Sequence, residues 1–329
     1  MVYLCDGRTQ CEGWADRQRG ITNLYMLAHL TGRQFKIIMN TPCDISNFYV
    51  PGPVQWIPTD SELNTSSNLT LNLFNKSVWL KFQEDLRTGD FNKEHSENVI
   101  YIKTNRMLFS LLQHNPFYSH KFLNWNRHRD VFKWAWNDLM QVSGQLLQKL
   151  SNVLGLLHLR KHGYTLNSNY SSSFSKVNYT HLICSHVRFG KNPDNPNDKD
   201  IGGFDVKYLP ALMNHMKVFD VDKRSRFFLA TDYEYLREEF HKFFTPRVIS
   251  TGVKVMHVDK DRNLDGACQG FEGALLEQLI LSSCDVLFIS IPKRHTSGFS
   301  KYAVLAAKKT PKTFSFVDGV IGGYNKYMF

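Results

Sequence analysis

The amino-acid sequence predicts an α/β protein of two domains with parallel, doubly wound sheets. The first observation is length, because 329 residues correspond to about two domains of roughly 150 residues each. The second is the alternation of strand-like and helix-like segments, which is clearest in the second half of the chain. The third is composition, since 42% apolar and 21% charged residues allow buried cores and exclude a disordered tail.

The first half opens with a strand, a loop that contains glycine, a helix and a second strand. Apolar residues recur at helical spacing, and Asp16 suits the start of a helix. Gly32 is predicted to end this helix, because glycine is preferred just beyond a helix C-terminus. A polar region separates the second strand from a third. The expected elements are helix Asp16–Thr31 and strands Val2–Cys5, Phe35–Met39 and Val99–Lys103.

A long helical pattern closes the first half. Leucine and valine recur there at steps of three and four between His128 and Arg160. Gly144 and Gly155 weaken the pattern, so two helices are an alternative to one. The following stretch, Gly163–Ser175, is rich in Ser, Asn and Tyr and is predicted to link the domains. The expected domains are therefore residues 1–165 and 176–329.

The second half alternates between strands and helices of ten to fifteen residues, which is the pattern of βαβ units in a parallel sheet. The predicted strands are His181–Arg188, Arg226–Thr231, Val253–Val258, Val286–Ile291 and Thr313–Val317. The predicted helices between them are Tyr208–Phe219, Tyr233–Phe244, Phe271–Ser283 and Phe299–Lys308. Ligands of such sheets bind beyond the carboxyl ends of the strands, so functional residues are expected directly after each strand.

The charge balance limits the class of partner. A net charge of +10 favours a polyanion such as nucleic acid, a membrane surface or a small molecule with phosphates. The basic residues are interleaved with acidic ones and do not cluster, so no nucleic-acid partner is expected. No apolar run is long enough to span a bilayer, and no signal peptide follows Met1.

The cysteines and the N-x-[ST] triplets bear on the cellular compartment. Cys5, Cys11 and Cys43 flank predicted turns and are candidates for disulfides. Cys184 and Cys284 lie in apolar, strand-like surroundings and are expected to be buried free thiols. No C-x-x-C pair is present, so we expect no zinc or other metal site. The N-glycosylation triplets lie in two polar stretches and favour the secretory pathway: Asn64, Asn68, Asn75, Asn169 and Asn178.

Polar side chains follow two predicted strands. Arg188 precedes a loop rich in Gly and Asn, where a guanidinium can bind a phosphate and Gly190 lets backbone N–H groups approach the same anion. The alternative is a structural arginine paired with a nearby carboxylate. Thr231 and Asp232 end the next strand, although Asp232 can equally be the N-cap of the following helix.

A third set of polar residues lies before the last predicted helix. Thr296, Ser297 and Gly298 occupy the helix start, where unpaired N–H groups and the helix dipole favour a phosphate. Lys293, Arg294 and His295 add positive charge beside them. Ordinary helix capping by Ser and Gly is the alternative interpretation.

Four ordered motifs resemble the GDP-fucose-dependent fucosyltransferases, the superfamily of α1,2-, α1,6- and protein O-fucosyltransferases. The motifs are His186-x-Arg188-x-Gly190, the strand end Ala230-Thr231-Asp232, the run Leu281-x-x-Cys284-Asp285 followed by Ser297-Gly298-Phe299, and the first-domain loop Gly13-Trp-Ala-Asp16-Arg17. The architectural resemblance extends over most of the chain. The motifs themselves are concentrated in residues 11–37 and 181–306.

The resemblance implies a GT-B fold, with two facing Rossmann-like domains and the donor held mainly by the second. By position, Arg188 corresponds to the arginine that grips the donor diphosphate and His186 to the histidine that contacts the guanine nucleotide. Glu277 corresponds to a carboxylate that reads guanine, and Thr296 or Ser297 to a donor-phosphate serine. The implied donor is GDP-fucose, with no cofactor, and the implied acceptor is a glycan or glycoprotein.

The chain departs from the family pattern at several positions. Phe189 stands where many relatives have a second arginine, and Ala15 replaces the second glycine of the first-domain loop. No carboxylate matches the presumed base of the α1,6 branch. Pro196 is nearest, with Asp194, Asp198 and Asp200 around it. The identity of the catalytic base is therefore left open.

The expected activity is an inverting, metal-independent transfer of fucose from GDP-fucose to a glycan or glycoprotein hydroxyl. One alternative is a metal-dependent GT-A transferase, which would use an Asp-x-Asp triplet: Asp198/Asp200, Asp220/Asp222 or Asp259/Asp261. Another is a catalytically degenerate protein that binds a GDP-sugar or glycan. Relatives lie in the Golgi or the endoplasmic reticulum lumen, so we expect that compartment. Because no membrane anchor is visible in this chain, either an upstream segment is missing or the chain has been trimmed.

Overall fold

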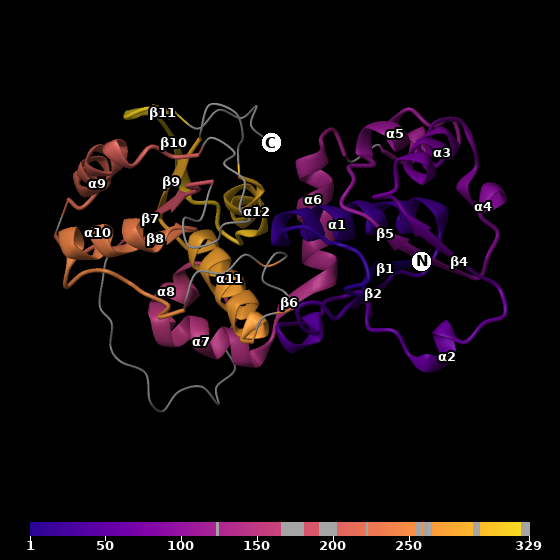
Figure 1. Cartoon of the computed structure of the whole chain (residues 1–329), viewed down its shortest axis with the longest axis horizontal. Coiled ribbons are helices and arrows are strands. Elements are labelled where there is room, and N and C mark those ends of the chain that lie inside the picture. Colours follow the sequence, from indigo (N-terminus) through magenta and orange to yellow (C-terminus); the bar gives the residue numbers. More distant parts are fainter. Residues whose placement is uncertain are drawn as a thin grey trace. The chain divides into compact units, whose positions relative to one another are not determined.

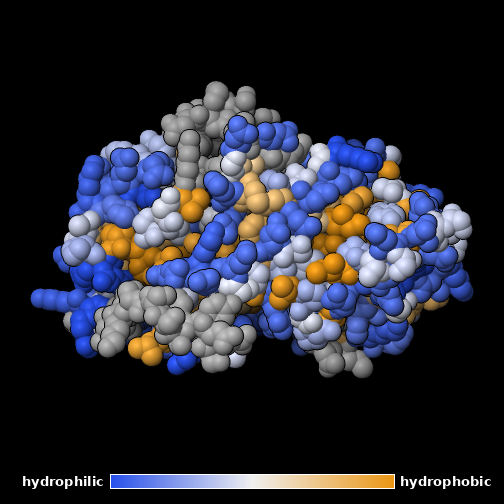
Figure 2. Space-filling model, turned by 90° about the horizontal axis from the view of Figure 1, so that it is seen from below, coloured by the Kyte–Doolittle hydropathy of each residue, from blue (hydrophilic) through white to orange (hydrophobic). Residues whose placement is uncertain are grey.

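The computed structural model describes most of the chain as two compact units. The first comprises Met1–Ser143 with Val258–Ala267, and the second comprises Gly144–His257 with Cys268–Phe329. No helix in the described part of the chain is long and apolar enough to cross a membrane. On the face seen in Figure 2, hydrophilic side chains predominate and apolar ones form small, separate areas. The described residues are 1–122, 125–165, 181–190, 203–221, 223–253, 258, 263, 265–291 and 297–323.

A parallel sheet in the order β2-β1-β5-β4 forms the centre of the first unit (Figure 1). The three predicted strands are confirmed as β1 (Val2–Cys5), β2 (Lys36–Met39) and β5 (Val99–Lys103). The fourth strand, β4 (Asn68–Asn72), lies at the edge of the sheet, within the polar region that was expected to separate the second and third strands. Its residues are exposed or half-buried, so its sequence lacks the apolar pattern of a central strand.

Helix α1 (Trp14–Thr31) is buried along most of its length. It begins at Trp14, two residues before the predicted start, so Asp16 lies in the first turn and Gly13 is the N-cap residue. Gly20 permits close packing, because a Cβ there would lie 2.1 Å from the carbonyl oxygen of Thr104, directly after β5. Gly32 ends the helix as predicted, in the left-handed conformation with φ 70°.

Short elements complete the first unit. Strands β3 and β6 pair with each other in an antiparallel, two-stranded sheet. The elements are η1 (Ile45–Asn47), β3 (Tyr49–Pro51), α2 (Asp60–Leu63), α3 (Lys76–Thr88), α4 (Phe91–Glu94), α5 (Phe109–Gln113), η2 (Ser119–Phe122), α6 (His128–Leu139) and β6 (Met140–Val142).

The long helical pattern that ends the first half is interrupted. After α6 and β6, the chain continues as α7 (Gly144–Leu154) and α8 (Leu156–Lys161), which break at the two glycines that weaken the pattern. The two compact units divide between Ser143 and Gly144, earlier than the predicted linker. Contacts explain the difference: Lys149 of α7 binds Glu272, and His158 of α8 binds the carbonyl oxygen of Ser283, both in the second unit.

A five-stranded sheet in the order β11-β10-β9-β7-β8 forms the second unit. Neighbouring strands are parallel except β10 and β11, which form an antiparallel hairpin. The prediction of alternating elements is confirmed, but strand Val253–Val258 lies mostly outside the described residues. The elements are β7 (Leu182–Val187), η4 (Val206–Tyr208), α9 (Leu209–Val218), β8 (Arg226–Thr231), α10 (Glu234–Phe244), α11 (Ala267–Ser282), β9 (Val286–Ser290), α12 (Gly298–Ala306), β10 (Lys312–Val317) and β11 (Val320–Gly323).

The expectation of free thiols in the second unit is wrong. Cys184 and Cys284 are both fully buried, and they form a disulfide that joins β7 to the turn before β9. Their apolar surroundings predicted burial correctly but could not show that the two sulfur atoms meet. Cys5 and Cys11 form a second disulfide, as their positions beside turns predicted.

The described N-glycosylation triplets are accessible. Asn64, Asn68 and Asn75 are exposed, and Asn75 also caps α3 by accepting hydrogen bonds from the backbone N–H groups of Ser77 and Val78. Asn169 and Asn178 lie outside the described residues.

Candidate functional site

The carboxyl end of β7 carries the ion pair of Arg188 and Asp232. Arg188 follows β7 and Asp232 follows β8, and because these strands are parallel neighbours, both residues lie at the same edge of the sheet. The Nη1 atom of Arg188 lies 2.7 Å from Oδ2 of Asp232, and the arginine side chain is 26% exposed. A guanidinium has five N–H donors, so this contact leaves capacity for an anionic ligand.

Asp232 also orders the backbone after β7. It accepts hydrogen bonds from the N–H groups of Phe189 at 2.6 Å and Gly190 at 3.1 Å. Tyr233, not Asp232, is the N-cap residue of α10, so the capping alternative for Asp232 is wrong. The carboxylate instead joins the ends of two neighbouring strands. Arg188 therefore forms the pair with a nearby carboxylate that the structural alternative predicted.

Two further groups support the same turn. Ser290, the last residue of β9, accepts a hydrogen bond from the backbone N–H of Arg188 at 3.3 Å. Gly203 packs against Phe189, and a Cβ at that position would lie 1.7 Å from the Phe189 carbonyl oxygen. Only glycine fits there without moving the backbone, so the chain at Gly203 passes close to the backbone of Arg188 and Phe189. Thr231 uses its hydroxyl to accept from the backbone N–H of Tyr233.

His186 lies on β7, two residues before Arg188, and is 5% exposed. Burial lowers the pKa of His186 to about 4, against the opposing attraction of Asp232. The imidazole is therefore neutral at pH 7. Its Nδ1 is buried and makes no hydrogen bond within the described residues. A buried nitrogen without a partner is costly, which is typical of a position that a ligand completes.

The start of α12 reaches the same region. Ser297 is the N-cap residue, and its hydroxyl accepts from the backbone N–H of Phe299 at 3.3 Å. The ring of Phe299 lies 5.4 Å from the ring of His186, so the structure brings the beginning of α12 and the end of β7 together. Gly298 is the first residue of α12. The other predicted members of this group lie outside the described residues: Lys293, Arg294, His295 and Thr296.

Glu277 is bound elsewhere in the second unit. Its Oε1 atom lies 3.0 Å from Nη2 of Arg237 on α10 and accepts a 3.4 Å hydrogen bond from the hydroxyl of Thr251. Burial raises the pKa of Glu277 to about 7, while Arg237 opposes the shift. The carboxylate thus has a cationic partner through Oε1, and the role of Glu277 in reading a guanine base stays a prediction.

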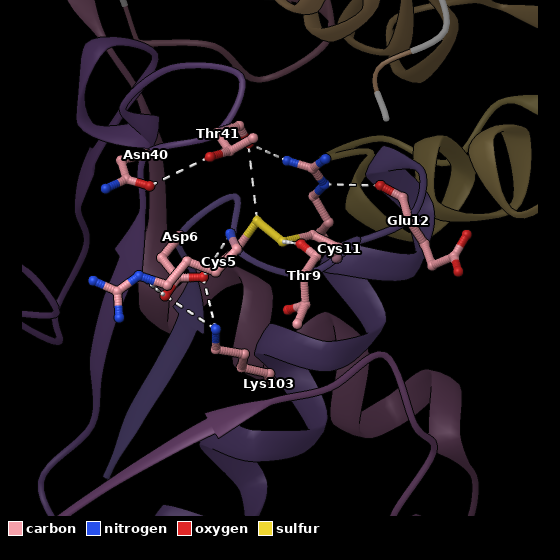
Figure 3. Close-up of a disulfide and its surroundings, with 10 residues drawn as sticks. Cys5, Asp6, Thr9, Cys11, Glu12, Asn40, Thr41 and Lys103 are labelled. Atoms are coloured by element: carbon pink, nitrogen blue, oxygen red, sulfur yellow. Dashed lines mark hydrogen bonds and ion pairs between the residues drawn. A yellow bond between two sulfur atoms is a disulfide. The ribbon is translucent and has the colours of Figure 1, made fainter. Parts of the chain in front are cut away.

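The first-domain loop is held rigidly between β1 and α1. The Cys5–Cys11 disulfide closes the loop, and Lys103 of β5 binds the carboxylate of Asp6 beside it (Figure 3). Arg17 is fully buried and donates to the carbonyl oxygens of Glu12 and Thr41. Arg17 therefore has a structural role in this loop.

The other two predicted loop residues are also structural. Gly13 is the N-cap residue of α1, and Asp16 pairs with Arg19 at 2.6 Å.

A cavity of about 520 Å³ lies beside this loop, and the sequence analysis did not identify it. Its walls come from the segments that follow β1, β4 and β5, at the carboxyl ends of the first sheet. The guanidinium of Arg106 lies 5.1 Å from the ring of Trp79. The general rule that ligands bind beyond parallel strands could have predicted this place. The lining residues are Thr9, Gln10, Glu12, Phe74, Asn105 and Arg106.

Comparisons with known proteins define the fold class. No family model and no curated protein sequence matches the chain. Solved structures do match it over nearly its whole length, and the structures are those of fucosyltransferases. The chain therefore has the fold of these enzymes, as the resemblance predicted.

Three of the matching structures illustrate the degree of similarity. A mutant of Arabidopsis thaliana FUT1 in complex with GDP has a TM-score of 0.55 and 14% identity, and covers 95% of this chain and 69% of that one. NodZ alpha-1,6-fucosyltransferase soaked with GDP-fucose has a TM-score of 0.53 and 14% identity, with 98% and 97% coverage. Fucosyltransferase NodZ from Bradyrhizobium has a TM-score of 0.52, 15% identity, and 98% and 96% coverage.

Proposed function

We propose that the chain is a fucosyltransferase that moves L-fucose from GDP-fucose to a hydroxyl of a glycan or glycoprotein. The observation that carries the proposal is the group of Arg188, His186 and the α12 N-terminus at the carboxyl edge of the second sheet. Solved fucosyltransferases with this fold include one in complex with GDP and one soaked with GDP-fucose. The two units would then act as the two facing Rossmann-like domains of a GT-B enzyme.

The proposed reaction inverts the anomeric carbon. The acceptor oxygen forms a bond to that carbon on one face while the bond to the diphosphate oxygen breaks on the other, and GDP leaves with the electron pair. The acceptor proton passes to a base or to water. Preorganised positive charge on the departing diphosphate supplies the largest stabilisation, and Arg188 with the N–H groups at the start of α12 can supply it without a metal.

Asp232 and His186 prepare this site. Asp232 holds the guanidinium on one side, so little conformational freedom is lost when the diphosphate binds the other donors. A neutral His186 adds no charge but offers a ring nitrogen to the nucleotide. Their contacts support a donor site that is assembled before the donor arrives.

The cavity of the first unit is the proposed acceptor site. Its lining offers a carboxylate from Glu12, an amide from Asn105 and a guanidinium from Arg106, which suit the many hydroxyls of a sugar. Glu12 is a candidate for the base that the sequence left open, because it is the only acidic residue among the described residues that line this cavity, which is large enough for a sugar ring. The linkage formed follows from the acceptor that this cavity accepts.

The deciding experiment is a transfer assay with the purified chain, GDP-fucose and an array of glycan and glycopeptide acceptors, with and without EDTA. We expect fucosylated product and released GDP in equal amounts, and equal initial rates in EDTA. Failure to bind GDP and to turn over GDP-fucose would reject the proposal. Loss of the initial rate in EDTA would reject metal independence alone.

A catalytically degenerate GDP-sugar or glycan-binding protein is the second candidate. Two observations favour it: Arg188 is partly neutralised by Asp232, and Phe189 replaces a second arginine. Tight GDP binding without product on any acceptor would support this candidate over the enzyme.

The described contacts give the metal-dependent GT-A alternative no support. Asp220 binds the guanidinium of Arg247 and the backbone N–H of Ser225, so its carboxylate is already engaged. The other acids of the three Asp-x-Asp triplets lie outside the described residues.

We further propose that the protein resides in the Golgi or endoplasmic reticulum lumen. Disulfides persist in oxidising compartments, and two bridges with exposed N-glycosylation triplets support that location.

A further inference from the structure

Three potential metal ligands meet at the amino end of the second sheet. They are His158 of α8, His162 directly after that helix, and Asp285 in the turn before β9. One ligand atom from each residue lies within 4.8 Å of those of the other two. The two histidines are four residues apart, a spacing that puts both imidazoles on one face of a helix and is common in zinc sites. Their rings lie 4.5 Å apart.

The outer contacts of this cluster resemble those that orient metal ligands. The Nε2 atom of His158 lies 2.7 Å from the carbonyl oxygen of Ser283, so it donates its proton there and presents Nδ1 as the basic atom. Oδ2 of Asp285 accepts a 2.9 Å hydrogen bond from the backbone N–H of Leu182, which leaves Oδ1 directed at the histidines. Ligating histidines usually donate their second nitrogen to a carbonyl or carboxylate in this way.

His162 is the observation that points to a missing ligand. Its side chain is 1% exposed, and neither ring nitrogen makes a hydrogen bond within the described residues. Nε2 lies 3.4 Å from Oδ1 of Asp285, in an arrangement that forms no hydrogen bond. A fully buried imidazole without hydrogen bonds is unfavourable unless another group binds it.

Lys161 is the competitor for the same carboxylate. Its ammonium lies 2.6 Å from Oδ1 of Asp285, but its side chain is 40% exposed. A long, partly accessible lysine can turn its ammonium towards water when a divalent cation binds Asp285, because the cation then neutralises the carboxylate in its place. The Lys161 ammonium is therefore the group that a metal ion would displace from Asp285.

We propose that His158, His162 and Asp285 bind one Zn²⁺. Two imidazoles and a carboxylate suit this borderline-soft cation, with water as a fourth ligand. The site is remote from the proposed donor site, since Asp285 binds the first residue of β7 while Arg188 follows the last, roughly 20 Å away along the strand. Zinc would clamp α8 to the sheet of the second unit, and this role is independent of the proposed transferase activity.

The test measures zinc content and thermal unfolding of the full chain. Protein is stripped with a chelator, dialysed, and titrated with ZnCl₂. We expect one bound zinc per chain and a rise in Tm with zinc concentration. His162→Gln should lose both the bound zinc and the rise in Tm. His120→Gln, which changes an exposed histidine on η2, is the matched control and should retain both.

Lys161→Met provides a second test of zinc binding, which can be used even if His162→Gln does not fold. Removal of the competing cation should tighten zinc binding by about fivefold to tenfold. If the cluster is only an ion-pair network, Lys161→Met should leave the protein without a zinc site. The absence of stoichiometric zinc in the wild-type chain, or a zinc response that survives in a folded His162→Gln variant, would overturn the proposal.

Discussion

The two ends of the second sheet use the same device for different purposes. At the carboxyl end, Asp232 binds the backbone of the turn after β7 and holds Arg188, whose side chain is 26% exposed. At the amino end, Asp285 binds the first backbone N–H of β7 and faces His162, whose side chain is 1% exposed. A carboxylate between neighbouring strands thus holds a partly exposed cation at one end, where we propose that the donor binds, and faces a buried imidazole at the other.

The largest expected effect is a loss of kcat at the carboxyl end of the sheet that does not occur at the amino end. Arg188→Ala should lower kcat by about 10²–10³-fold, because it removes charge stabilisation of the leaving diphosphate. Arg226→Ala is the matched control, since Arg226 begins β8 at the other end of the strand and its side chain donates to the carbonyl oxygen of Pro246. Its kcat should stay within about twofold of the wild type. Steady-state kinetics on both variants measure this contrast, and equal losses would break it.

Substitution of the two aspartates should affect different properties, activity for Asp232 and stability for Asp285. Asp232→Asn should lower kcat by roughly tenfold or more, because the guanidinium loses its partner and its position. Asp285→Asn should instead lower the free energy of unfolding by about 3 kcal/mol, because it weakens a partly buried ion-pair network.

Urea unfolding and initial rates, measured on both aspartate variants, give the comparison. A stability loss confined to Asp232→Asn, with activity lost only in Asp285→Asn, would reverse the assignment.

The burial of His186 should make the free energy of unfolding depend on pH. Burial lowers its pKa to about 4 from an ordinary 6.5, so between these values the unfolded chain binds more protons than the folded one. Its contribution to stability is therefore complete above pH 6.5 and falls as the pH drops to 4, by about 3 kcal/mol in total. His186→Gln should flatten this part of the stability profile, as followed by urea unfolding at several pH values. An unchanged slope would show that His186 is not buried as a neutral group.

The smallest expected effect concerns the N-cap of α12. Ser297→Ala should lower the free energy of unfolding by about 1 kcal/mol, because one backbone N–H of the helix loses its acceptor. Ser297→Thr retains a hydroxyl and is the matched control. If Ser297 also binds the donor, its alanine variant should raise the KM for GDP-fucose several-fold, whereas a pure cap leaves KM unchanged.

Most of the second unit could be predicted because its elements are apolar and regularly spaced. Strand β8 was predicted to the residue, and α10 and β9 within one residue of each end. Strand β4 was missed, because an edge strand buries little and need not alternate in hydrophobicity. The division between Ser143 and Gly144 was not predicted, since periodicity shows which helix face is buried but not which neighbour covers it.

The sequence by itself determined the alternating architecture and the place of Arg188 and Asp232 after their strands, because both follow from local pattern and from parallel-strand geometry. Only the tertiary structure decided their partners. In the folded chain, Arg188 pairs with Asp232 and Glu277 with Arg237. Cys184 forms a disulfide with Cys284, and His158 and His162 lie beside Asp285. Each of these contacts joins residues far apart in the chain. Their meeting depends on how helices pack against the sheet, which no local pattern encodes.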